Sequence, residues 1–480
     1  MALGDVDYGL MAVVGGLSAF ISFLNSLFGS AIGRFYGIAI GKSNAIGDGD
    51  IEECRRWFSI AVAIHTIIPV FLMAVGYPLG EWAVRHFLTI PTNRIAACIW
   101  VFRFVCISCF VGMVGIPFNA MYTMKQYIAE LTLYSFVTAT FNVICLGYMV
   151  SHPGVWLVKY AFWTCLLSVA PQLIIAARAC RMFPECHFCW RYAWDITRFR
   201  QVVSYAGWTA FGGLAMVLKN QGSAILVNKF FGPAVNAAMG IAGSVNAHAL
   251  SLTNALQGAM NPVITTAVGA GDLGLATRLA FRFCKIAVVL SLVFTLPLAI
   301  ELPEIIRLWL HTPPEYVVGL CWIMLAISFV DKQTLGHGMI VMANGRVKAY
   351  QIVLGSFNIL ALPLAWFFCS NGLNVYWVGV ALLITWMMLS YGRLYFARKI
   401  VGMSIRLWVT RILIPIIIVL MLSSVSGCVP RMFLAQSVMR VLITTLMTEI
   451  VLLPLAWGFV LDSDERHFIV SRLKKFYCHT

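Results

Sequence analysis

The side chains that could do chemistry in this sequence are a few ionisable residues embedded in long apolar runs. They are Arg34, Arg103, Lys219 and Lys332, which are basic, and Asp331 and Glu449, which are acidic. Because the basic residues outnumber the acidic ones, the set carries spare positive charge, which suits a phosphate or pyrophosphate group. The alternative role for any one of them is an interhelical ion pair, for example of Asp331 or Glu449 with a basic partner.

A second group consists of polar residues in the apolar run 234–266. At about 100° per helical residue they share an arc roughly 100° wide. They are Asn236, Asn246, Thr253, Asn254, Gln257 and Asn261. Exposing such a stripe of amides to lipid is energetically unfavourable. It therefore either lines a water-filled path or forms hydrogen bonds between packed helices. Amides both donate and accept hydrogen bonds, which suits the hydroxyl groups of sugars.

Three histidines, His65, His248 and His337, also lie in apolar runs. A buried, hydrogen-bonded histidine needs no functional role. Among the functional readings, His65 together with Asp331 and Glu449 supplies the candidates for coupling transport to protons.

The composition restricts what kind of molecule can hold these residues. Of 480 residues, 61% are hydrophobic and only 11% are charged, and the net charge is +15. A soluble chain of this length has too little polar surface to cover that much apolar area. A soluble enzyme, a secreted disulfide scaffold and a disordered chain are therefore excluded, and an all-α polytopic membrane protein is predicted.

Apolar runs of about 20 residues can cross a bilayer, and the sequence has thirteen of them. They lie at about 8–40, 57–78, 95–117, 128–150, 155–177, 203–230, 234–266, 280–301, 317–341, 350–369, 375–394, 409–425 and 437–460. With the C-terminus in the cytoplasm, 23 of the 34 basic residues fall in cytoplasmic segments, including 393–411. This bias sets the orientation and accounts for much of the positive charge without nucleic acid as a partner. An odd number of spans places the N-terminus outside, so we expect one further N-terminal helix.

An internal repeat indicates how the spans are grouped. Residues 56–62 resemble 282–288, and Lys125-Gln126-Tyr127 resembles Lys348-Ala349-Tyr350, each pair six spans apart. An even separation gives the repeats the same orientation, which is a transporter architecture. We therefore predict an N-terminal lobe of five helices at 1–177 and a basic cytoplasmic linker at 178–202. A six-helix lobe follows at 203–397, and two additional spans with a cytoplasmic tail occupy 398–480.

Catalytic motifs are missing from the sequence. It has no Walker A motif, and no GxSxG or HExxH pattern occurs in a suitable context, so we expect no enzyme and no cofactor. Fourteen cysteines occur, many inside apolar runs, where packed free thiols are the simplest reading. Cys186 and Cys189 form a lone CxxC, and zinc is the alternative there, although no second pair completes a ligand set.

Several short segments resemble the polysaccharide flippases of the multidrug/oligosaccharidyl-lipid/polysaccharide exporter superfamily. They are Leu3–Gly9, Gly33-Arg34-Phe35, Gly41–Asn44, Ile116–Asn119, Lys219-Asn220-Gln221, Asn228, Phe231–Pro233, Val235–Ala238, Asn261-Pro262, Gly271-Asp272 and Ala343–Arg346. The resemblance covers nearly the whole chain. Members usually carry one helix before the segment that matches Leu3–Gly9, whereas this sequence starts at that segment.

The resemblance implies a V-shaped, two-lobed exporter fold in a bacterial cytoplasmic membrane. It implies a flippase that moves an undecaprenyl-pyrophosphate-linked glycan by alternating access for surface polysaccharide, such as the O-antigen of lipopolysaccharide. Partners would be the lipid-linked glycan, membrane lipid, and glycosyltransferases and a polymerase of the same pathway. Arg34, Lys219 and Asn220, with Arg103 and Lys332, would hold the pyrophosphate, and the amide stripe would line the glycan path.

Two other functions remain open at this level. A cation-coupled multidrug exporter has the same fold, although spare positive charge inside the membrane disfavours cationic drugs. A polyprenyl-linked membrane glycosyltransferase would need a carboxylate or histidine cluster and usually a large extramembrane loop, which the sequence lacks.

Overall fold

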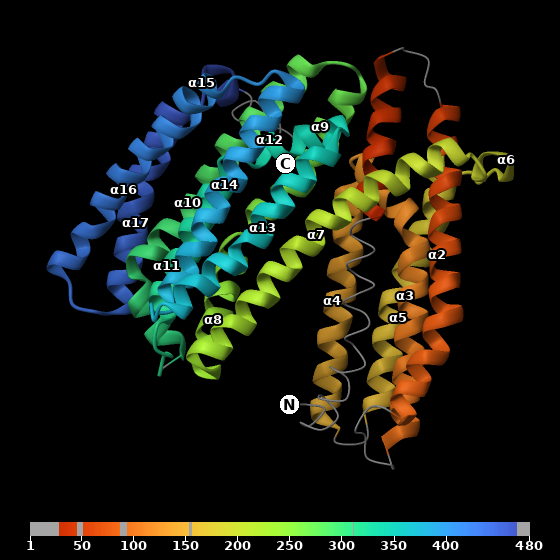
Figure 1. The fold of residues 1–480 in the computed structure, drawn as a ribbon, viewed down its shortest axis with the longest axis horizontal. Coiled ribbons are helices and arrows are strands. Elements are labelled where there is room, and N and C mark those ends of the chain that lie inside the picture. Colours follow the sequence, from red (N-terminus) through yellow and green to blue (C-terminus); the bar gives the residue numbers. More distant parts are fainter. Residues whose placement is uncertain (1–27, 46–50, 87–93, 153–155, 311, 468–480) are drawn as a thin grey trace. The chain divides into compact units, whose positions relative to one another are not determined.

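The computed structural model describes residues 28–45, 51–86, 94–152, 156–310 and 312–467. These residues are almost entirely helical and include no strand, which confirms the all-α prediction (Figure 1). Ten of the helices are long and apolar enough to cross a membrane. The pair α11 (Val317–Lys332) and α12 (Leu335–Asn344), bent by 49°, gives an eleventh if it is counted as one span.

Two of the thirteen predicted spans differ from this set. The run 8–40 lies partly outside the described residues, and its described part belongs to a helix over 28–45. The run 234–266 is not one helix, because α8 (Pro233–Ala249) and α9 (Ser251–Gly269) are separated by a turn at Leu250. Polar residues crowd this break, and their side chains offer the backbone hydrogen bonds that compete with a continuous helix.

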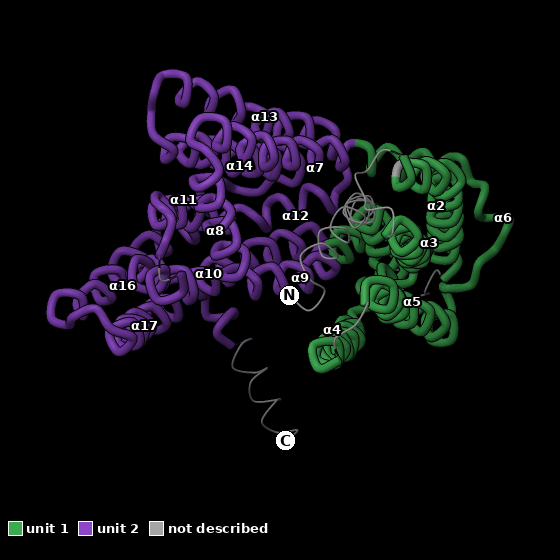
Figure 2. The backbone as a smooth tube through the Cα atoms, turned by 90° about the horizontal axis from the view of Figure 1, so that it is seen from below, with its two compact units in different colours: residues 1–207, 265–271 green, residues 208–264, 272–480 purple. Residues whose placement is uncertain are grey.

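The chain divides into two compact units, coloured separately in Figure 2. Unit 1 comprises residues 1–207 and 265–271. Besides 28–45, its helices are α2 (Ile51–His86), α3 (Ile95–Met124), α4 (Ile128–Ser151), α5 (Leu157–Met182) and the short α6 (Trp190–Ala193). Helix α3 packs against α2 and α5, and Asn119 of α3 donates a 2.7 Å hydrogen bond to Gln172 of α5. A Cβ atom on Gly41 would overlap the Thr266 carbonyl oxygen, so only glycine permits this close approach.

Unit 2 comprises residues 208–264 and 272–480. It holds most of α7 (Ile196–Phe231), α8, most of α9, and α10 (Leu273–Leu310), followed by α11 and α12. Next come α13 (Val347–Ser370), α14 (Tyr376–Val401), α15 (Ile405–Trp408), η2 (Val409–Leu413), α16 (Ile414–Phe433), α17 (Val438–Leu455) and η3 (Ala456–Val460). Gly232, with φ of 85°, makes the turn between α7 and α8. Pro233 is the first residue of α8, a position that proline favours.

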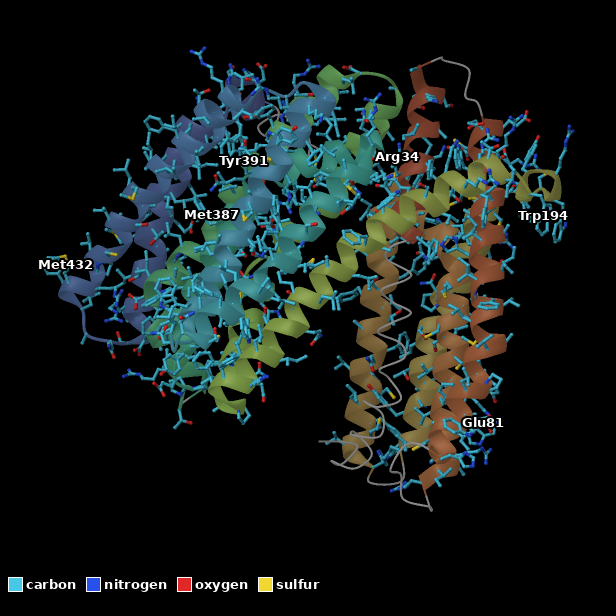
Figure 3. All side chains as sticks on the ribbon, viewed as in Figure 1. Arg34, Glu81, Trp194, Met387, Tyr391 and Met432 are labelled. Carbon is cyan, nitrogen blue, oxygen red and sulfur yellow. The ribbon has the colours of Figure 1, made fainter. Side chains whose placement is uncertain are left out.

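Helices α16 and α17 form a hairpin that packs on α10, with Met432 near its tip in Figure 3. Helix α10 kinks at Glu301, which leaves helical geometry between two prolines. The buried Glu301 carboxylate accepts hydrogen bonds from Arg440 at 2.7 Å and Thr444 at 2.8 Å, both in α17. Arg431 donates to the Ile300 carbonyl oxygen at 3.0 Å. The hairpin therefore supplies partners for the polar groups at the kink.

Candidate functional site: a cationic cavity in unit 2

A cavity of about 550 Å³ lies within unit 2, between α7, α8, α9, α11 and α14. Its polar lining comes from all five helices: Lys219, Asn220, Ser223, Asn236, Asn246, Asn254, Ser328, Asp331, Lys332 and Trp386. Most of the residues predicted from the sequence to bind substrate in this half of the chain are thus brought to one place. Their role in binding stays a prediction.

The shape of the cavity depends on small residues in α8. Gly240 and Gly243 line it, and a Cβ atom on either would meet no other atom within 4 Å. The missing side chains leave open volume beside the amide groups. Because glycine is a poor helix former, these two positions lower the stability of α8. The same two positions leave room for the cavity.

The charged wall of the cavity is built around Asp331. Arg393 of α14 donates a 2.6 Å hydrogen bond to Asp331 Oδ1, and Lys332 Nζ lies 3.4 Å from Oδ2. Lys332 Nζ also donates to Asn254 Oδ1 of α9 at 3.2 Å. The alternative reading of Asp331 as an ion-pair partner is confirmed, and one carboxylate is shared between two cations.

Lys219 is the third cation of this wall. Its side chain is 1% exposed, and within the described part of the chain its Nζ has no hydrogen-bond partner. The ammonium lies 4.5 Å from the centroid of the Trp386 ring, a cation–π contact. A buried ammonium without a hydrogen-bond partner is incompletely compensated, so the cavity favours an anion beside Lys219.

The amide groups give the cavity its hydrogen-bonding capacity. Asn246 Oδ1 accepts a 2.7 Å hydrogen bond from the Ser328 hydroxyl, which fixes that side chain between α8 and α11. Asn220 and Asn236 add further amides from α7 and α8. The site therefore combines a cationic wall with groups that can donate to and accept from hydroxyls.

No protein-family model and no curated protein matches this sequence. Solved structures do match. An outward-facing multidrug resistance MATE family transporter of the MOP superfamily aligns with a TM-score of 0.69 at 14% identity, over 83% of this chain and 89% of that chain. The chain has the fold of these transporters.

Two further solved structures are similar to this chain. A MOP superfamily transporter from Pyrococcus furiosus aligns with a TM-score of 0.64 at 14% identity, over 84% of this chain and 91% of that one. Its description states that the reverse polarity of its binding pocket suggests a different function. A MATE structure in the bent conformation aligns with a TM-score of 0.67 at 14% identity, over 84% of this chain and 90% of the other.

Two predicted substrate contacts lie in unit 1 instead. Arg34, labelled in Figure 3, places its guanidinium 4.9 Å from the ring centroid of Phe35 and 5.1 Å from that of Tyr205. Arg103 donates to the Tyr77 hydroxyl at 3.0 Å and lies 3.7 Å from Glu81, near the end of α2. The contacts of Arg103 are those of a residue that joins α2 to α3.

The remaining predicted residues are dispersed. Gln257 and Asn261 lie farther along α9 than Asn254, and they are outside the cavity lining that Asn254 joins. His65 is buried in α2, and its Nδ1 donates to the Ala61 carbonyl oxygen at 2.8 Å. Glu449 lies in α17, where neither carboxylate oxygen has a partner among the described residues. The involvement of all these residues in coupling or binding stays a prediction.

Sequence reasoning missed Trp386 and Arg393. Arg393 was assigned to a cytoplasmic basic segment, but α14 continues to Val401, which places Arg393 inside the helix and against Asp331. The signal that could have located it is the predicted span 375–394, whose last turn already includes Arg393. As for metals, no group of three or more potential ligands is assembled among the described residues.

Proposed function

We propose that this chain is a flippase for a lipid-linked oligosaccharide, an undecaprenyl-pyrophosphate glycan of surface polysaccharide synthesis. The observation that carries the proposal is the cationic, amide-lined cavity of unit 2. Lys219 and Lys332 would bind the pyrophosphate, and Asn220, Asn236 and Asn246 would contact the first sugars. The transported glycan would move from the cytoplasmic to the outer leaflet by alternating access, in a bacterial inner membrane with the C-terminus inside.

The charge balance of the cavity supports a pyrophosphate. Lys332 and Arg393 pair with the Asp331 carboxylate, and Lys219 adds a third cation beside Trp386, so this group has an excess of two positive charges. A pyrophosphate diester carries two negative charges at neutral pH, so its binding would neutralise the buried group. In a site of low dielectric constant, neutral assemblies are strongly favoured over charged ones.

A direct binding measurement tests the proposal. Full-length protein in lipid nanodiscs is titrated with a short-chain polyprenyl-pyrophosphate sugar, and Lys219→Gln and Lys332→Gln are compared with the wild type. Lys229→Gln is the matched control, since Lys229 is exposed and lies in the same helix α7. Both cavity variants should weaken binding at least tenfold, and the control should not. Equal affinity in all four proteins would refute the assignment.

The second candidate is a cation-coupled multidrug exporter, favoured by the likeness to the multidrug resistance transporter structure. Its discriminating test is in cells. Deletion of the gene in its host should cause lipid-linked repeat units to accumulate if the chain is a flippase. Expression in a drug-sensitive strain should raise resistance if it is a drug exporter. Resistance without an effect on lipid-linked glycan would favour the second candidate.

A further inference from the structure

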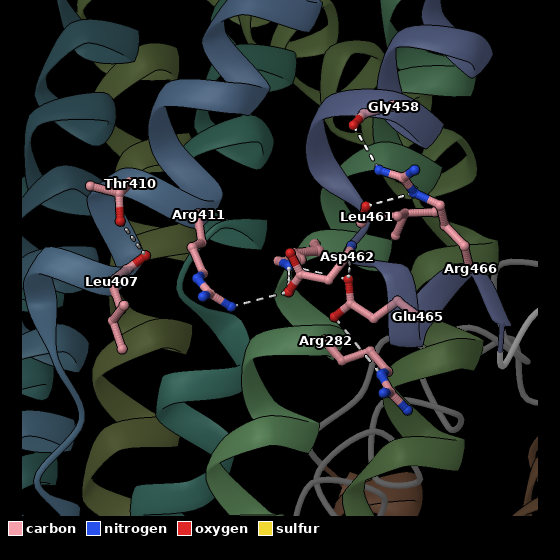
Figure 4. Close-up of polar contacts among 10 residues, drawn as sticks. Arg282, Leu407, Thr410, Arg411, Gly458, Leu461, Asp462, Glu465 and Arg466 are labelled. Atoms are coloured by element: carbon pink, nitrogen blue, oxygen red, sulfur yellow. Dashed lines mark hydrogen bonds and ion pairs between the residues drawn. The ribbon is translucent and has the colours of Figure 1, made fainter.

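A second cavity of unit 2, of about 260 Å³, lies at the start of α10. The start of the span 405–433 and the end of the span 438–460 also adjoin it. It is lined by one face of the first turns of α10, by Leu407 and Arg411 at the start of the 405–433 span, and by Asp462, Asp464 and Glu465 just after η3. Figure 4 shows the polar contacts of this region. The cavity is separate from the cationic cavity and shares none of its residues.

The wall of this second cavity is a preorganised network. Lys285, only 2% exposed, donates hydrogen bonds to Asp462 at 2.8 Å and to Glu465 at 3.1 Å. The Asp462 backbone N–H donates to Glu465 Oε2 at 2.9 Å, which closes the turn after η3. Arg411, whose side chain is exposed, lies 3.4 Å from Asp462 (Figure 4).

Two oppositely charged residues of the lining take no part in this network. Arg278, in the second turn of α10, and Asp464, in the turn after η3, both line the cavity and are exposed. Among the described residues, neither takes part in an ion pair or a side-chain hydrogen bond. The lining of the cavity thus includes an available cation and an available carboxylate, with Arg411 as a further, exposed cation.

The position of the cavity points to a lipid headgroup. All three segments that line it are ends of membrane-spanning helices, which is the level of the headgroups. Exposed apolar side chains continue from it along the spans, including Leu407, Ile414 and Phe459. Acyl chains could follow these side chains while the headgroup stays in the cavity.

We propose that this cavity binds a zwitterionic phospholipid with a primary ammonium, of the phosphatidylethanolamine type. The lipid phosphate pairs with Arg278 and Arg411, and the ammonium donates hydrogen bonds to Asp464. An anionic headgroup without an ammonium would leave Asp464 opposed to its negative charge. A choline headgroup has no N–H group to donate. The mixed charge of the lining therefore selects for the ethanolamine headgroup.

The test measures lipid retention. Purified full-length protein is depleted of lipid, exposed to an equimolar mixture of phosphatidylethanolamine, phosphatidylglycerol and phosphatidylcholine, and analysed by native mass spectrometry. We expect preferential retention of phosphatidylethanolamine. Asp464→Asn should lower that retention about fivefold without lowering that of phosphatidylglycerol. Arg278→Gln should lower both, and Arg406→Gln, an exposed arginine of α15 outside the cavity lining, should change neither.

Two results would overturn the proposal. One is retention of phosphatidylglycerol or phosphatidylcholine equal to that of phosphatidylethanolamine, and the other is an Asp464→Asn variant that retains phosphatidylethanolamine as the wild type does. Soluble glycerophosphoethanolamine serves as a competitor in a separate arm. If it binds as tightly as the intact lipid, the ligand is a free headgroup and the lipid assignment is wrong. None of these measurements depends on transport, so the lipid proposal can fail while the flippase proposal holds, and the reverse.

Discussion

Replacing Lys219 with methionine should weaken anion binding and, at the same time, stabilise the fold. Methionine has nearly the same length and no charge, so it can occupy the same buried position. The Lys219 ammonium has no hydrogen-bond partner within the described residues and lies 4.5 Å from the centroid of the Trp386 ring. Its burial therefore costs the folded state more than the aromatic contact returns.

The magnitudes follow from this geometry. An ammonium about 4 Å from a phosphate oxygen contributes up to about 4 kcal/mol at an effective dielectric constant near 20. Hydrogen bonds to charged groups contribute about 1.5–3 kcal/mol net. We expect Lys219→Met to lose about 2 kcal/mol of pyrophosphate binding, or about 30-fold in Kd. The free energy of unfolding should rise by about 1 kcal/mol, since the desolvation penalty exceeds the lost cation–π energy.

Lys332→Met is the matched comparison, because Lys332 is equally buried but paired with Asp331 and Asn254. Its loss should destabilise the fold by about 1–2 kcal/mol, less than for a fully broken buried pair, since Arg393 still neutralises Asp331. Thermal unfolding in nanodiscs measures stability, and titration with a polyprenyl-pyrophosphate sugar measures affinity. The reasoning is refuted if Lys219→Met lowers the unfolding temperature as much as Lys332→Met, or if it binds the ligand like the wild type.

Three more predictions concern separate parts of the chain. Gly243→Leu should fill part of the cavity and reduce binding of the lipid-linked sugar at least tenfold without lowering the unfolding temperature, since a Cβ atom there meets nothing within 4 Å and leucine is the better helix former. Arg440→Met should destabilise the protein by about 3 kcal/mol, because it leaves the buried Glu301 carboxylate without its cation; thermal unfolding at an unchanged temperature would contradict this. Asp195 accepts hydrogen bonds from the backbone N–H groups of Arg198 and Thr197 at the start of α7, and these, with the Arg198 guanidinium, lower the pKa of its carboxyl. Its stabilising contribution is present above the unfolded pKa near 4 and is lost as pH falls through the lower folded pKa, so the stability gap between wild type and Asp195→Ala should close in acid.

The sequence by itself determined the class of the protein and part of the cavity. Apolar runs of membrane-spanning length require helices, because backbone polar groups in lipid must be satisfied internally. The rarity of charge and amide groups in those runs marked Lys219, Lys332, Asp331 and the asparagines as residues that need a polar environment. These are one-dimensional properties, readable from residue type and helical period.

The tertiary structure decided which of those residues meet. Arg393 neutralises Asp331 from 62 positions away, and no local pattern encodes such a distant contact. The amide stripe is divided between α8 and α9, and of its members Asn236, Asn246 and Asn254 reach the cavity whereas Gln257 does not. The spare charge of Lys219 is likewise a property of its neighbours. It exists because three helices supply cations around one carboxylate, and only their packing could show it.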